Sequence, residues 1–165
     1  NNAGIIVRAD VSGTTDEDWR QTMTINLDVP FFLSRAALPH LHSAQGSIIN
    51  IASDWGINGG ERAAAYCASK GGLVLLTKAM ARDHARAGLR INAICPGDVD
   101  TPMLITEAEA SATPIEDFLD SAAAGVPRGR VAQPEEIASL ALFLAGDGAA
   151  HINGTAILVD GGANA

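Results

Sequence analysis

The sequence is poor in cysteine and aromatic side chains and contains no long apolar run. Only two cysteines occur, and aromatic residues make up 4% of the chain. Cys67 and Cys95 show no metal-ligand spacing, so we interpret them as reduced structural thiols and expect neither a disulfide framework nor a metal site. No apolar run approaches the length that crosses a bilayer, and no signal-peptide pattern opens the chain. The histidines, which also lack ligand spacing, are His40, His42, His84 and His151.

The chain is also short of positive charge. Its formal net charge is −8, which disfavours nucleic acid and anionic membrane surfaces as partners. With 47% hydrophobic and 18% charged residues, the 165 residues are typical of one globular domain or of part of one. We therefore expect neither nucleic acid nor a membrane as a partner, and the two reduced cysteines favour the cytoplasm as the compartment.

Strand-like and helical patterns alternate along the sequence. Short apolar runs predict strands at 47–51, 89–95 and 155–159. Helical patterns separate them, at 16–46, 62–86 and from Pro134 to about 145; Thr15 is the expected N-cap of the first. This alternation predicts an α/β fold in which a parallel sheet carries helices on both faces.

Residues 102–126 follow no strand pattern and are rich in Ala, Thr, Glu and Asp. Because they come directly after a Pro-Gly turn at the end of a strand, they could cover the open end of the sheet as a mobile lid. A solvated pair of surface helices is the alternative, and the two readings are compatible.

Tyr66 and Lys70 carry the clearest chemical signal. A spacing of four places the phenol and the ammonium on one face of a helix, one turn apart. A tyrosine ordinarily loses its proton near pH 10, and a neighbouring cation favours the phenolate and lowers that pKa. The pair can exchange a proton with an alcohol or a carbonyl if another group carries the hydride. Ser53, which follows an apolar strand, is a candidate to bind the substrate oxygen, although it could also cap local backbone.

Asn26 lies four residues before Pro30 within the first helical pattern. In an α-helix its carbonyl would accept from the amide of residue 30, but proline has no N–H. We therefore expect a kink there and a free carbonyl that can hold a water. A proline kink that serves packing alone is the other interpretation.

These residues occur together with two further motifs. Asn-Asn-Ala-Gly stands at 1–4, and Pro-Gly-Asp-Val-Asp-Thr stands at 96–101. From Asn1 to Gly162, the chain resembles the short-chain dehydrogenase/reductase family, in the subgroup with an Asn-Ser-Tyr-Lys tetrad. The resemblance implies a three-layer αβα Rossmann-like fold and NAD or NADP as cofactor.

The resemblance also implies roles for individual residues. In the tetrad, Asn26 would hold a relay water, Ser53 would position the substrate oxygen, Tyr66 would transfer the proton, and Lys70 would tune Tyr66 and bind the nicotinamide ribose. Asp54 and Trp55 are expected to face the substrate together with Ser53 and Tyr66. The residues expected to contact the cofactor are Asn2, Ala3, Gly4, Tyr66, Lys70, Pro96, Gly97, Val99 and Thr101.

One feature of the family is missing from the sequence. No G-x-G-x-x-G loop followed by a helix occurs, whereas in the family a glycine-rich nucleotide-binding turn precedes the Asn-Asn-Ala-Gly motif. We therefore expect residues 1–165 to be the C-terminal part of a single Rossmann-like domain, without the first strands and the residues that choose between NAD and NADP.

The function expected from these features is interconversion of a secondary alcohol and a ketone. A sugar or polyol is the first candidate, from Asp54-Trp55 and an acidic lid. A 3-oxoacyl thioester is the second; an acidic carrier protein would need a basic rim, for which only Arg128 and Arg130 are available. A non-catalytic relative, or an inactive fragment, is a third possibility. The family also implies a homotetramer paired through the Tyr66 helix and the preceding long helix. The acidic lid residues are Glu107, Glu109, Glu116, Asp117 and Asp120.

Overall fold

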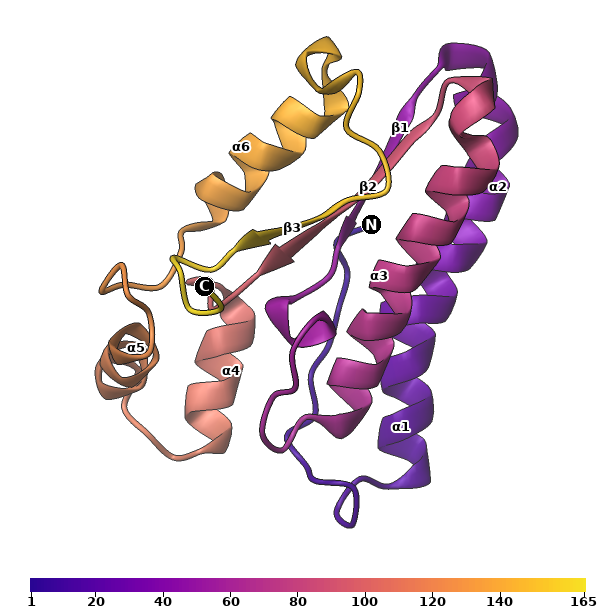
Figure 1. Ribbon diagram of the computed structural model, residues 1–165. Helices are drawn as coiled ribbons and strands as arrows, with labels where there is room; N and C mark the ends of the chain where they lie inside the picture. The colour runs from indigo at the N-terminus through magenta and orange to yellow at the C-terminus, as the bar shows by residue number, and fades with distance from the viewer.

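The computed structural model describes residues 1–165 and shows three parallel strands between two layers of helices (Figure 1). The strands are β1 (Ser47–Ile51), β2 (Arg90–Pro96) and β3 (Ala156–Val159), in the spatial order β1-β2-β3. In register, Ser47 lies opposite Arg90 and Ala93 opposite Ala156. The predicted α/β class and parallel sheet are confirmed, and each predicted strand is correct to within one residue at either end.

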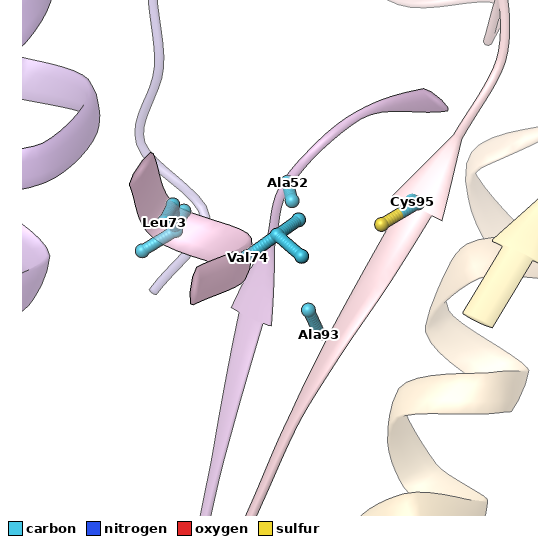
Figure 2. Packing of buried hydrophobic residues seen from close by; sticks show 5 residues of the cluster. All are labelled: Ala52, Leu73, Val74, Ala93 and Cys95. Atoms are coloured by element: carbon cyan, nitrogen blue, oxygen red, sulfur yellow. The ribbon is translucent and has the colours of Figure 1, made fainter. Parts of the chain in front are cut away.

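Helices cover both faces of the sheet. On one face lie α2 (Val29–Ala44) and α3 (Ala64–His84), and on the other lies α6 (Pro134–Ala145) (Figure 1). Side chains of β2 alternate between the two layers, since Ala93 and Cys95 pack with α3 whereas Ile94 packs with Leu144 of α6. Figure 2 shows Val74 of α3 directed towards Ala52 and Ala93.

The first predicted helix is divided in two by a wide turn. α1 (Asp16–Met23) is followed by a π-helical turn at Thr24–Asp28, where the Val29 amide donates to the Thr24 carbonyl five residues back. The interruption lies where the Asn26–Pro30 spacing predicted it. At the other end of α1, the Asp18 amide donates to Thr15 Oγ1 at 3.1 Å, which confirms the predicted N-cap.

Residues 102–126 form two helices beyond the C-terminal ends of β2 and β3 (Figure 1). They are α4 (Pro102–Ala110) and α5 (Ile115–Ala124). α4 carries two buried side chains, Leu104 and Ala108, whereas α5 has none that is fully buried. The helix pair is therefore attached to the domain mainly through α4.

The first residue of the chain also pairs with the sheet. The Asn1 amino group donates to the Ile49 carbonyl at 2.9 Å, and the Ile51 amide donates to the Asn1 carbonyl at 2.9 Å. This is the bonding pattern of a parallel strand neighbour. The Asn-Asn-Ala-Gly motif thus begins beside β1. No helix in the structure is long and apolar enough to cross a membrane.

Candidate active site

A cavity of about 850 Å³ lies at the C-terminal edge of the sheet. The Asn-Asn-Ala-Gly motif, the turn after β1, the Tyr66 helix and the Pro-Gly turn after β2 form part of its wall, and α4 and α6 add to it together with Ile6 and Arg8. Open parallel sheets bind ligands at this edge. The predicted site residues that line the cavity are Asn2, Ala3, Gly4, Ser53, Asp54, Trp55, Tyr66, Lys70, Pro96, Gly97, Val99 and Thr101.

Asn26 is the one predicted residue that does not line the cavity, because Gly4 separates it from Lys70. A Cβ added to Gly4 would lie 3.3 Å from Lys70 Nζ and 3.5 Å from Asn26 Oδ1. The Asn26 side chain is fully buried and is clamped, since Oδ1 accepts from the Ile5 amide and Nδ2 donates to the Ile5 carbonyl, both at 2.9 Å. Nδ2 also donates to Ser69 Oγ at 3.0 Å. Asn26 therefore joins the π-helical turn to the segment around Ile5 and to α3, behind the cavity wall.

Burial controls the ionisation of Tyr66. The side chain is 8% exposed, and its ring meets Trp55 edge-on with centroids 6.3 Å apart. Burial raises the pKa of Tyr66 to about 12, against a smaller opposite effect from the Ser53 hydroxyl. The sequence-based prediction of a pKa lowered by Lys70 is wrong for this structure, because removal of the phenolate from water outweighs any attraction by the ammonium.

Lys70 is buried as well, with 3% of the residue exposed. Its Nζ donates to the Ile51 carbonyl at 2.8 Å and lies 5.7 Å from the centroid of the Tyr66 ring. Burial lowers the pKa of Lys70 to about 8. The ammonium has one acceptor in the protein and retains further N–H donors at the cavity wall.

Ser53 and Asp54 form a small hydrogen-bonded unit after β1. Ser53 Oγ accepts from the Trp55 amide at 3.1 Å and donates to Asp54 Oδ1 at 3.0 Å. The second carboxylate oxygen, Asp54 Oδ2, accepts from Asn164 Nδ2 at 3.1 Å. Asp54 thus orients the serine hydroxyl and is itself held by the protein.

The turn after β2 is fixed by pairing with residue 132. The Asp100 amide donates to the Ala132 carbonyl and the Ala132 amide donates to the Asp98 carbonyl, each at 2.9 Å. Thr101 Oγ1 donates to the Val99 carbonyl at 3.2 Å, and Thr101 precedes α4 as its N-cap. A Cβ at Gly97 would approach the Asp160 Cβ at 3.2 Å, which explains the small residue.

The sequence missed Arg8 as a lining residue. Its guanidinium lies 4.4 Å from the centroid of the Trp55 ring and forms an ion pair with Glu107 of α4. A lone cation inside the otherwise apolar Ile-Ile-Val-Arg-Ala run was the one signal that could have drawn attention to it.

Four of the five expected acidic lid residues point to solvent, and only Glu107 lines the cavity. Of the expected acidic lid, a single carboxylate therefore reaches the site. No group of three or more His, Cys, Asp or Glu side chains is placed to hold a metal ion.

Comparisons with known proteins identify what the chain resembles. Residues 1–164 match the family described as "Enoyl-(Acyl carrier protein) reductase". The chain is 44% identical over 165 residues to meso-2,3-butanediol dehydrogenase of Serratia marcescens, covering 100% of this chain and 63% of that protein. It is 40% identical over 164 residues to L-fucose dehydrogenase of Mus musculus, covering 99% of this chain and 59% of that protein.

Two solved structures share the fold. Ligand-free aldohexose dehydrogenase of Thermoplasma acidophilum superimposes with a TM-score of 0.94 at 34% identity, covering 99% of this chain and 66% of that one. The second is a Beutenbergia cavernae protein assigned as an NAD(P)-dependent gluconate 5-dehydrogenase and solved with NADP at low occupancy. It superimposes with a TM-score of 0.89 at 36% identity, covering 98% of this chain and 63% of that one. The chain thus spans less than two thirds of the length of each of these proteins.

Proposed function

The chain belongs to the short-chain dehydrogenase/reductase family, and from this premise we propose that the intact protein is an NAD(P)-dependent oxidoreductase that interconverts a secondary alcohol and a ketone. The observation that carries the proposal is that Ser53, Tyr66 and Lys70 line one cavity at the C-terminal edge of a parallel sheet.

The residues at the cavity wall fit a nicotinamide cofactor. Lys70 supplies buried N–H donors suited to ribose hydroxyls, and the wall beside it is the side-chain-free Gly4. The rest of the cofactor would be contacted by the backbone of Val99, the side chain of Thr101 and the Asn2–Gly4 segment. When bound, the nicotinamide accepts or supplies the hydride.

Tyr66 is the proton-transfer group in this proposal. Because burial holds the phenol protonated at neutral pH, Tyr66 can donate to the oxygen of a ketone as it becomes an alkoxide. Ser53, whose hydroxyl is fixed by Asp54 and the Trp55 amide, positions that oxygen. Lys70 stabilises the phenolate left after transfer.

Asn26 is assigned to the path by which the proton is replaced. Its carbonyl lacks the amide donor that residue 30 would otherwise offer, because residue 30 is Pro30. The proposed role is to hold a water that links Lys70 to solvent. The close approach of Asn26 and Lys70 on either side of Gly4 supports this role.

An uncharged sugar or polyol is the proposed substrate. The butanediol, fucose and aldohexose dehydrogenases found by comparison act on hydroxylated small molecules, as their names state. The rival substrate, a 3-oxoacyl thioester on an acidic carrier protein, has less support. Arg130 of the expected basic rim forms an ion pair with Glu136 at 2.7 Å, and neither Arg128 nor Arg130 lines the cavity.

We further propose a cytoplasmic homotetramer in which α4 and α5 act as a lid. A tetramer with two kinds of interface needs two self-complementary surfaces. Exposed apolar side chains occur on several elements, and two of the places that could serve are α2 with α3 and α6 with β3. These side chains are Phe31, Phe32 and Leu75 in the first place and Leu142, Phe143 and Leu158 in the second.

Nicotinamide absorbance tests the proposal directly. The intact protein, with the preceding nucleotide-binding segment, is assayed against polyols, sugars and 3-oxoacyl thioesters, with NAD and with NADP, beside Tyr66→Phe. We expect turnover of a polyol or sugar that is lost in the variant. Turnover that survives in Tyr66→Phe would refute the role of Tyr66, and cofactor binding without turnover would favour a non-catalytic protein. Residues 1–165 alone should bind neither cofactor tightly, and micromolar affinity would contradict this.

A further inference from the structure

Arg8, Trp55 and Glu107 meet at the wall of the cavity. The Arg8 guanidinium stacks on Trp55, donates through Nη1 to the Glu61 carbonyl at 3.3 Å and pairs through Nη2 with Glu107 Oε2. Arg8, Trp55 and Glu107 all line the cavity. The ion pair therefore joins the segment before α1, which carries Arg8, to α4, which carries Glu107.

The two partners differ in how well water reaches them. The Glu107 side chain is 10% exposed, whereas that of Arg8 is 36% exposed. Arg8 keeps its aromatic and carbonyl contacts if Glu107 is removed, so its guanidinium stays oriented. The Glu107 carboxylate has no hydrogen-bond or ion-pair partner other than Arg8. It would therefore be left nearly buried and unpaired if Arg8 bound another anion.

Other charges at this end of the cavity are also negative. Apart from Lys70, Arg8 is the only cationic side chain that lines the cavity, whereas Asp54, Asp98 and Glu107 are all present. The pKa of Asp98 is raised, first by burial and then by the charges of Asp54 and Glu107, with Arg8 acting in the opposite direction. A carboxylate-bearing substrate would therefore add a fourth negative charge and compete for a guanidinium that is already paired.

We propose that Glu107 determines substrate charge: by occupying Arg8, it makes the cavity accept uncharged alcohols and exclude hydroxy acids. This inference rests on the proposed function. Without the carboxylate at position 107, the Arg8 guanidinium is free to bind the carboxylate of a substrate. It stays oriented for this, because Trp55 and the Glu61 carbonyl still hold it.

The test compares wild type, Glu107→Gln and Glu109→Gln in the intact protein. Glu109 is the matched control, since it lies on the same helix but is exposed and outside the cavity. Each is assayed with butane-2,3-diol and with 3-hydroxybutyrate. We expect kcat/KM for the acid relative to the diol to rise at least about tenfold in Glu107→Gln and to stay unchanged in Glu109→Gln. An unchanged ratio in Glu107→Gln, or an equal rise in both variants, would overturn the inference.

A binding measurement separates this inference from the proposed function. Titration with 3-hydroxybutyrate, followed by tryptophan fluorescence, needs no turnover. We expect binding to Glu107→Gln, none to wild type, and none to the Arg8→Gln/Glu107→Gln double variant. If no protein turns over but this binding pattern holds, the proposed function fails and the charge selection stands. Equal binding to all three proteins, or to none, would overturn the charge selection.

Discussion

Asn164 Nδ2 donates to Asp54 Oδ2 at 3.1 Å across a separation of 110 residues. The same Nδ2 donates to Asp160 Oδ2 at 2.9 Å, so the turn after β3 is tied to the turn after β1. Since Asp54 Oδ1 accepts from Ser53 Oγ, Asn164 lies two hydrogen bonds from the proposed catalytic serine. The C-terminal turn thereby becomes part of the support of the site.

Asn164→Ala should lower kcat by about tenfold, about 1.4 kcal/mol, with a smaller change in KM. Without the Asn164 amide, Asp54 Oδ2 loses its donor and the carboxylate is held only through Oδ1, by the Trp55 amide, so it fixes the serine hydroxyl less firmly. Asn164→Asp keeps the shape, loses the donor and places a third carboxylate beside Asp54 and Asp160, so its loss should be larger. Steady-state kinetics with a thermal melt checks both variants. Wild-type kcat in both would show that Asn164 does not position the serine.

Lys70 should make stability depend on pH in the alkaline range. The folded pKa is about 8 and the ordinary value is 10.5, so between these values the unfolded chain binds a proton that the folded protein does not. The free energy of unfolding therefore rises as pH increases from about 8 to about 10.5, by up to about 3 kcal/mol.

The comparison with Lys70→Met isolates this effect. The pKa of Tyr66 is raised to about 12 in the folded protein, so its contribution lowers the free energy of unfolding as pH rises above the ordinary value of 10. This contribution is present in both wild type and variant. Urea unfolding across the range gives the difference between wild type and variant at each pH. Parallel curves would mean that Lys70 titrates at its ordinary pKa in the folded protein.

Gly60 should resist substitution although its neighbour Gly59 tolerates it. A Cβ at Gly60 would lie 2.2 Å from Trp55 Cδ2, whereas a Cβ at Gly59 meets nothing within 4 Å. Gly60→Ala must displace the indole and with it the stacked Arg8, at a cost of about 1–3 kcal/mol. Gly59→Ala should stay within about 0.5 kcal/mol of wild type. Thermal melts of the two alanine variants compare them, and similar melting temperatures would refute the packing argument.

The sequence predicted much of the fold because its signals are local. The apolar run at 47–51 gave β1 with its observed bounds. The Asn26–Pro30 spacing located an interruption that the structure shows as a π-helical turn. What the spacing could not give was the form of that turn, since the clamp of Asn26 on Ile5 and Ser69 depends on segments distant in sequence.

The sequence predicted the site residues that belong to motifs and missed those that are brought to the site by tertiary packing alone. Every expected cofactor and substrate contact residue lines one cavity, whereas the roles assigned to these residues stay predictions. Arg8 and Asn164 belong to no motif, and their partners lie far away along the chain. Glu107 was expected only as one of five lid carboxylates, and its pairing with Arg8 was not foreseen.

By itself the sequence determined the three strands, the Thr15 cap and the placement of Tyr66 and Lys70 on one helix face. Backbone hydrogen bonding and residue spacing act over a few positions, so neighbouring residues suffice to fix them. Only the tertiary structure decided the direction of the Tyr66 pKa and which of the lid carboxylates reaches the cavity. Desolvation and ion pairing depend on everything that surrounds a group in space, and those surroundings come from the whole fold.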